Sequence, residues 1–225
     1  MKEKLDYRLI ASDLDGTLLK DDKSVGQETY EAIQRYMAAG GKFCICTGRM
    51  LPSVEKIAAE LGVKGIATSY AGALVSDLST GDILYENSLS AKDAAEIAEF
   101  VEKDGVHLQF YTGRTYYANR DDETLARYES SCRVKAIPVL DKPLSALIRK
   151  KNEKVNKLLI IVENLDKHRD LLDKYQAKFG ERFWVTRSTL RYIEILSKSC
   201  NKGTALKFMA EELEVKQLDD VVVRF

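Results

Sequence analysis

Two aspartates separated by one residue, Asp13 and Asp15, have the clearest chemical potential in this chain. They follow residues 8–12, an apolar run typical of a buried strand, and they precede Gly16 and Thr17. In a parallel sheet, ligands bind beyond the carboxyl ends of the strands. Two carboxylates there are costly to bury unless a cation or a shared proton compensates their charge. A turn or helix cap is the ordinary alternative, but the preceding strand and the following threonine favour a functional site.

Two further short motifs, one with Thr47 and Gly48 and one with Lys202, lie at junctions between a predicted element and a loop. Thr47 and Gly48 close the run at 42–46, and a hydroxyl and an N–H at that position could both donate to a phosphate oxygen. Lys202 begins a helical segment, where its charge opposes the helix dipole, so stability alone does not explain it. Singly, these residues also fit a strand end and a solvated lysine. Their shared position at junctions indicates one anion site.

The first part of the chain alternates strand and helix signals. Strands are predicted at 8–12, 42–46 and 65–68, and helical spacing occupies the segments between them, from Tyr30 to Met37 and from Pro52 to Leu61. Because strand–helix–strand units form right-handed crossovers, this order predicts a parallel sheet.

From about residue 84 the pattern changes. Ser90 with Asp93 has the spacing of a helix capping box, and the strand-like runs 106–111 and 115–118 flank a hairpin signal. Further helices are predicted at 123–130 and 166–179, and further strands at 157–162, 183–186 and 192–196. The alternation of strand and helix signals then resumes, with a helix predicted at 202–213 and an apolar strand at 221–225. The sequence predicts an α/β fold in which an α+β domain, 85–195, is inserted into a core formed by 1–84 and 196–225.

The motifs together resemble the haloacid dehalogenase superfamily. The resemblance rests on Asp13-Leu14-Asp15-Gly16-Thr17, on Thr47-Gly48-Arg49 and on Asn201-Lys202-Gly203-Thr204. The inserted domain is similar to the large cap of the Cof-type sugar-phosphate phosphatases. Residues 68–74 are similar to the segment after the third strand of that group, although Ala71 replaces its usual asparagine. The resemblance implies a Rossmann-like parallel core with an α+β cap.

The resemblance also implies roles for the site residues. Asp13 is expected to be the nucleophile that forms an aspartyl-phosphate, and Asp15 the general acid and then base. Magnesium is expected on the Asp13 carboxylate and the Asp15 backbone carbonyl, where it offsets repulsion between carboxylate and phosphate. The expected phosphate-binding residues are Leu14, Thr47, Gly48 and Lys202. The implied activity is hydrolysis of a small phosphorylated metabolite such as a sugar phosphate.

The resemblance implies one more acidic motif after the last strand, and the sequence reaches Phe225 before it. Asp219 and Asp220 precede that strand and are not expected to replace the missing ligand, so a weaker magnesium site is expected. Two interpretations stay open. The sequence is a truncated or frame-shifted version of a longer enzyme, which the retained site residues favour, or it is a catalytically silent phosphate-binding module.

The charge balance and the apolar runs of the chain limit the classes of partner that we expect it to bind. Lysine and arginine number 35, as do the acidic residues, so neither nucleic acid nor an anionic membrane is an expected partner. The apolar runs, such as 158–162, are too short to span a bilayer, and no signal peptide is evident. Cys44 and Cys46 alternate in an apolar run, which indicates a buried strand face rather than a metal site and favours a reducing cytoplasm. Oligomeric state is left open.

Substrate choice is expected to depend on the inserted domain. The hairpin near residue 113 is rich in aromatic residues, which more often pack than bind substrate. Both histidines, His107 and His168, are expected to be structural or solvated. The candidate substrate contacts are Tyr111, Arg114, Tyr116 and Tyr117.

Overall fold

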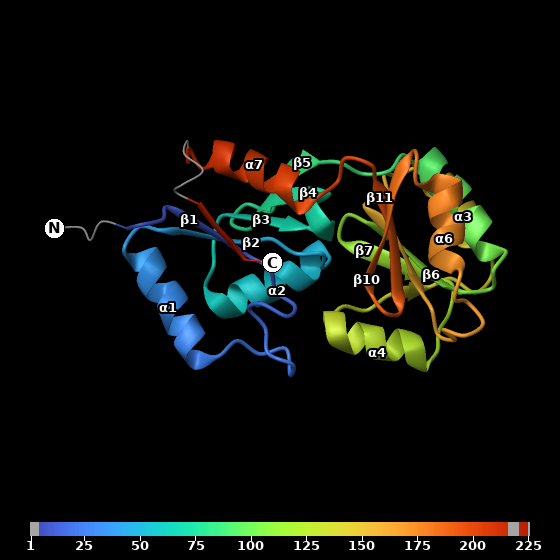
Figure 1. Cartoon of the computed structure of the whole chain (residues 1–225), viewed down its shortest axis with the longest axis horizontal. Coiled ribbons are helices and arrows are strands. Elements are labelled where there is room, and N and C mark those ends of the chain that lie inside the picture. Colours follow the sequence, from blue (N-terminus) through green and yellow to red (C-terminus); the bar gives the residue numbers. More distant parts are fainter. Residues whose placement is uncertain (1–4, 216–220, 225) are drawn as a thin grey trace. The chain divides into compact units, whose positions relative to one another are not determined.

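The computed structural model describes residues 5–215 and 221–224 and has mixed α/β architecture (Figure 1). By its internal contacts the chain divides into two units. The first comprises Met1–Glu86 and Asn201–Phe225, and the second Asn87–Cys200. A parallel sheet in the first unit confirms the predicted fold class.

Three parallel strands form the centre of the first unit, in the order β12-β1-β2. They are β1 (Leu9–Ser12), β2 (Lys42–Ile45) and β12 (Val221–Arg224). The register places Ser12 opposite both Ile45 and Arg224, so the carboxyl ends of all three strands meet at one edge. Asp13 is the first residue beyond β1 at that edge.

The third predicted strand, β3 (Ile66–Ser69), lies beside the end of β2 through a parallel bridge between Cys46 and Thr68. It continues into an antiparallel sheet with β4 (Leu74–Asp77) and β5 (Ile83–Glu86), which the sequence analysis did not predict. A tight 3₁₀ turn, Tyr70–Gly72, joins β3 to β4 and makes this reversal possible.

Helices cover both faces of the parallel strands. Successive strand side chains point to opposite faces, so Phe43 and Ile45 pack with α1 (Gln27–Ala38) and α2 (Leu51–Leu61). Cys44 instead packs with α7 (Lys202–Glu212) on the other face. Figure 1 shows α1 and α2 on one side of these strands and α7 on the other.

The second unit is built on a six-stranded sheet in the order β10-β11-β9-β6-β7-β8, antiparallel except where β7 meets β8. An apolar core fills the space between one sheet face and three helices. The helix α4 (Glu123–Cys132) meets Tyr111 and Tyr116 from the other face. The strands are β6 (His107–Thr112), β7 (Thr115–Ala118), β8 (Ile137–Pro138), β9 (Lys157–Ile161), β10 (Phe183–Thr189) and β11 (Tyr192–Ser197), and the three helices are α3 (Ala91–Glu102), α5 (Leu144–Lys151) and α6 (Leu171–Phe179).

The elements predicted from local sequence signals in this unit are partly confirmed. Ser90 caps α3 as predicted, because its hydroxyl oxygen accepts the Asp93 N–H at 3.1 Å. The helix predicted from residue 166 begins only at Leu171, and His168 lies in the preceding turns. Neither β8 nor α5 was predicted. The two residues of β8 are too short to show a strand period.

Candidate active site

Asp13 lies at the open edge of the parallel sheet. Its side chain is 18% exposed, so it does not point into the core. One carboxylate oxygen accepts the Leu14 backbone N–H at 2.7 Å, and the other contacts the Lys202 ammonium. The Ser12 hydroxyl donates to the Asp13 carbonyl at 2.9 Å. Both oxygens of one carboxylate are therefore matched by positive or hydrogen-bonding groups.

Lys202 reaches this carboxylate because of where α7 begins. Asn201 caps the helix by accepting the Thr204 N–H at 2.8 Å. Gly72, at φ 101°, lies so close that a Cβ added to it would be 2.4 Å from the Asn201 carbonyl oxygen. The turn Tyr70–Gly72 is thus fitted against the start of α7, and it fixes the point from which the Lys202 side chain extends.

Thr47 and Gly48 belong to the same edge. The Cys46 N–H donates to the Ser12 carbonyl at 2.8 Å, which brings the end of β2 beside the end of β1. Thr47 is buried, and its hydroxyl oxygen accepts the Arg49 N–H at 3.3 Å. A Cβ on Gly48 would meet nothing within 4 Å, so space remains beside its backbone.

Asp15 has different partners from Asp13. Its carboxylate accepts hydrogen bonds from Arg49 through Nε at 2.7 Å and Nη2 at 2.8 Å, and from the Lys23 ammonium at 2.9 Å. The Arg49 guanidinium, assisted by Lys23, lowers the pKa of Asp15 to about 2 against the effect of burial. Asp15 is therefore ionised at neutral pH in this arrangement.

Arg49 and Lys23 are the two residues of this cluster that the sequence analysis did not assign to the site. Arg49 was part of the Thr47-Gly48-Arg49 motif, so its position two residues after the threonine was an available signal. Lys23 had no such signal, because it reaches Asp15 only through a turn. The backbone of Lys23 is left-handed at φ 65°, and its N–H donates to the Lys20 carbonyl at 2.9 Å.

The donor atoms near Asp13 fit a water-rich magnesium site. Within residues 5–215 and 221–224, no three side chains of His, Cys, Asp or Glu gather as a metal-binding group. Magnesium commonly keeps several waters and takes one or two carboxylates, which the Asp13 carboxylate with the Asp15 carbonyl can satisfy. Asp219 and Asp220 lie outside the described residues.

The cysteines near the sheet do not join the site. Burial raises the pKa of both Cys44 and Cys46 to about 12, which favours the protonated thiols. Both side chains are buried, so the buried position predicted for the two cysteines is confirmed.

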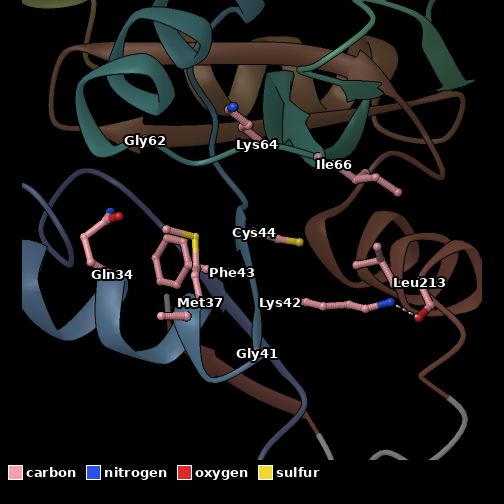
Figure 2. A pocket seen from close by; sticks show the side chains of 12 residues that line it. Gln34, Met37, Gly41, Lys42, Phe43, Cys44, Gly62, Lys64, Ile66 and Leu213 are labelled. Atoms are coloured by element: carbon pink, nitrogen blue, oxygen red, sulfur yellow. Dashed lines mark hydrogen bonds between the residues drawn. The ribbon is translucent and has the colours of Figure 1, made fainter.

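A hollow of about 580 Å³ lies at the opposite, amino-terminal end of β2 (Figure 2). Met37, Phe43 and Ile66 contribute apolar surface to it, and Lys64 lines it as well. Lys42, the first residue of β2, donates to the Leu213 carbonyl at its margin. Because Asp13 follows the carboxyl end of the neighbouring strand, this hollow is separate from the candidate active site.

The family model described as haloacid dehalogenase-like hydrolase matches residues 10–223 of the chain. The chain belongs to this family. The predicted resemblance is thereby confirmed, and with it a hydrolase of the phosphatase type. No helix in the described part of this haloacid dehalogenase-like hydrolase is both long and apolar enough to cross a membrane.

Among its relatives, a Streptococcus pyogenes protein provisionally named a phosphatase is 30% identical over 93% of this chain and 77% of its own. An HMP-PP phosphatase of Serratia proteamaculans is 26% identical over 95% of this chain and 75% of its own. The crystal structure of a Thermotoga maritima protein has a TM-score of 0.82 at 26% identity, covering 96% of this chain and 79% of that one. A haloacid dehalogenase-like hydrolase from B. subtilis has a TM-score of 0.83 at 22% identity, covering 96% and 82% respectively, and shows the same fold.

Proposed function

We propose that this haloacid dehalogenase-like hydrolase is a magnesium-dependent phosphatase that acts through Asp13 on a small phosphorylated metabolite such as a sugar phosphate. The supporting observation is the Asp13 carboxylate, which lies at the open sheet edge between the Leu14 N–H and the Lys202 ammonium. A carboxylate held in this way is oriented for attack on phosphorus.

In the first step an Asp13 oxygen attacks the phosphorus and the bond to the leaving oxygen breaks, which gives an aspartyl-phosphate. Water then attacks the same phosphorus, releases phosphate and regenerates Asp13. Asp15 gives a proton to the leaving oxygen and takes one from the water. Arg49 and Lys23 hold Asp15 ionised, which is the form required for the second step. The first step requires Asp15 to move away from these cations and take up a proton from solvent before it donates that proton to the leaving oxygen.

The transferring oxygens are held by Lys202, Thr47 and the N–H groups of Leu14 and Gly48 in this proposal. The Asp13 carboxylate and the Asp15 carbonyl would hold magnesium, whose charge would offset repulsion between the attacking carboxylate and the phosphate. Because oriented donors stabilise charge that develops in the transition state, each is expected to affect turnover more than ground-state binding.

The second unit, Asn87–Cys200, is proposed to act as the cap that selects the leaving group. All four cysteines are buried thiols that form no disulfide within the described residues, which supports a reducing compartment such as the cytoplasm.

A phosphate-binding module without turnover is the alternative. The small number of carboxylates near the expected metal position favours this alternative. The Asp15 carboxylate is paired with Arg49 and Lys23, which leaves the Asp13 carboxylate as the side-chain ligand of the proposed magnesium site. Binding of phosphate without hydrolysis of any substrate would support this alternative.

A panel of sugar phosphates, assayed with magnesium and then with EDTA, tests the proposal. Asp13→Asn is expected to lower kcat by about a thousandfold or more, because the nucleophile is removed. Asp6→Asn is the matched control, since Asp6 is an exposed aspartate before the other end of β1. Hydrolysis that persists in Asp13→Asn, or in EDTA, would contradict the mechanism.

A further inference from the structure

The turn Tyr70–Gly72 is anchored by its backbone to the segment that follows β2. The Tyr70 N–H donates to the Arg49 carbonyl at 2.9 Å, and the Ala71 N–H donates to the Thr47 carbonyl at 3.0 Å. The Tyr70 side chain is fully buried. A shift of the turn would therefore break two hydrogen bonds and open the core, and both changes cost free energy.

The start of α7 forms the other side of this contact and is less firmly packed. A Cβ added to Gly72 would lie 2.6 Å from the Asn201 carbonyl carbon and 3.1 Å from the Lys202 backbone nitrogen. Asn201 and the two residues after Lys202 are exposed. A side chain at position 72 would thus displace the start of α7 rather than the turn.

Two separate requirements call for glycine at position 72. Its φ of 101° is a conformation that residues with a Cβ rarely adopt, and the approach of Asn201 leaves no room for a Cβ. Gly65 meets only the first requirement, because its φ is 97° and an added Cβ would have nothing within 4 Å. The same substitution at the two glycines therefore separates backbone strain from the contact with α7.

Displacement of the start of α7 would move Lys202, the first residue of that helix. The Lys202 ammonium contacts a carboxylate oxygen of Asp13. A charged donor stabilises a phosphate oxygen only within hydrogen-bond reach, and a misplacement of about 1 Å can cost about a hundredfold in rate. The position of the helix start is therefore a chemical requirement as well as a structural one.

We propose that Gly72 is a positioning residue of the phosphatase reaction: because it lets the Asn201 carbonyl approach its backbone, it places Lys202 where the ammonium can hold a phosphate oxygen beside Asp13. This inference rests on the proposed function, in which Lys202 binds the transferring phosphate. The turn is hydrogen-bonded to the Thr47 carbonyl and abuts α7, so it links two proposed phosphate-binding segments that are far apart in the sequence.

Binding of inorganic phosphate, measured by calorimetry at fixed free magnesium, tests this without depending on turnover. Gly72→Ala is expected to weaken phosphate binding about tenfold, because the Lys202 ammonium is displaced. Gly65→Ala is the matched control, which introduces the same backbone strain without the contact, and it should keep wild-type binding. Circular dichroism checks that both variants fold.

A double-mutant cycle tests whether Gly72 acts through Lys202. In the Lys202→Ala background, Gly72→Ala is expected to change phosphate binding by less than about twofold, because the group that it displaces is gone. A glycine with a purely structural role would not show this dependence on one distant ammonium.

Asn201→Ala tests the same contact if Gly72→Ala does not fold. It removes the side-chain cap of α7 but leaves the Asn201 carbonyl against Gly72, so it should lower stability and keep phosphate binding. Equal weakening in Gly72→Ala and Gly65→Ala, a fully additive loss in the double variant, or loss of phosphate binding in Asn201→Ala would overturn the inference and leave the proposed function standing. Phosphate binding that Lys202→Ala does not weaken would overturn both.

Discussion

Each unit of the molecule holds a lysine–carboxylate pair next to its sheet, and the two pairs differ in surroundings. In the first unit, Lys202 and Asp13 are 22% and 18% exposed at the end of β1. In the second, Lys157 and Glu194 are 4% and 10% exposed, within β9 and β11. The Lys157 ammonium lies 5.2 Å from the centre of the Tyr111 ring.

We propose that one pair is functional and the other structural. The pair in the second unit is enclosed by partners, since Glu194 also accepts from the Ser188 hydroxyl at 2.9 Å. The pair in the first unit stands at a strand end where a ligand can reach it. In this proposal the location of the first pair at the carboxyl edge of a parallel sheet, more than its residue types, distinguishes it from the structural pair.

We expect the largest effect on stability from a substitution that breaks the buried pair of Lys157 and Glu194. Lys157→Ala leaves the Glu194 carboxylate buried without its cation, and we expect the free energy of unfolding to fall by about 3–5 kcal/mol. Urea denaturation measures it. Lys150→Ala, an exposed lysine of the same unit, is the control and should change stability little. A small loss in Lys157→Ala would show that Glu194 is hydrated after all.

The next largest effect is expected for the more exposed pair, Lys202 and Asp13. Lys202→Ala removes the ammonium beside Asp13, and we expect kcat to fall about a hundredfold or more while the fold persists. Steady-state kinetics and circular dichroism measure the two effects. Lys207→Ala, exposed on the same helix, should keep wild-type kinetics. Equal turnover in the two variants would remove Lys202 from the site.

A smaller effect is expected at the aromatic hairpin of the second unit. The Tyr111 hydroxyl donates to Gln109 at 2.5 Å and lies 2.7 Å from the Tyr128 hydroxyl, and its ring stacks on Tyr116. Tyr111→Phe should cost about 1–2 kcal/mol of stability and leave kcat and KM unchanged. A changed KM with unchanged stability would instead favour the substrate contact considered from the sequence.

The smallest effect is a difference in pH dependence. Burial lowers the pKa of His107 below 6.5, so its neutral form is favoured in the fold and stability is lost as pH falls below 6.5. Asp15, with its pKa lowered to about 2 from 3.8, contributes stability above pH 3.8 that is lost as pH falls toward 2.

Between pH 7 and 5 only the His107 contribution should change. His107→Gln is expected to flatten the slope of unfolding free energy in that range, whereas His168→Gln, which replaces the other histidine, should keep it. Denaturation at several pH values gives the slopes, and identical slopes for wild type and His107→Gln would contradict this assignment.

The sequence predicted the elements whose signals are local. The buried strand before Asp13, the Ser90 cap and the strands around the hairpin at Gly113 are confirmed. The turn Tyr70–Gly72, the strands β4 and β5 and the start of α6 were missed or misplaced. A turn with three successive positive φ values, two of them at Tyr70 and Ala71, goes against the intrinsic preferences of its residues. Tertiary contacts hold it, since it packs against the start of α7 and its N–H groups donate to the carbonyls of Arg49 and Thr47.

By itself the sequence predicted which residues are candidates for the chemistry and which local elements end at them. Asp13, Thr47 and Lys202 were identified because each stands at a junction that hydrophobic periodicity marks. Only the tertiary structure decided the partners of Asp15. Arg49 and Lys23 come from different segments, and the side chains of separate segments meet at distances that the backbone path sets and no local pattern encodes. The ionised state of Asp15 follows from that meeting.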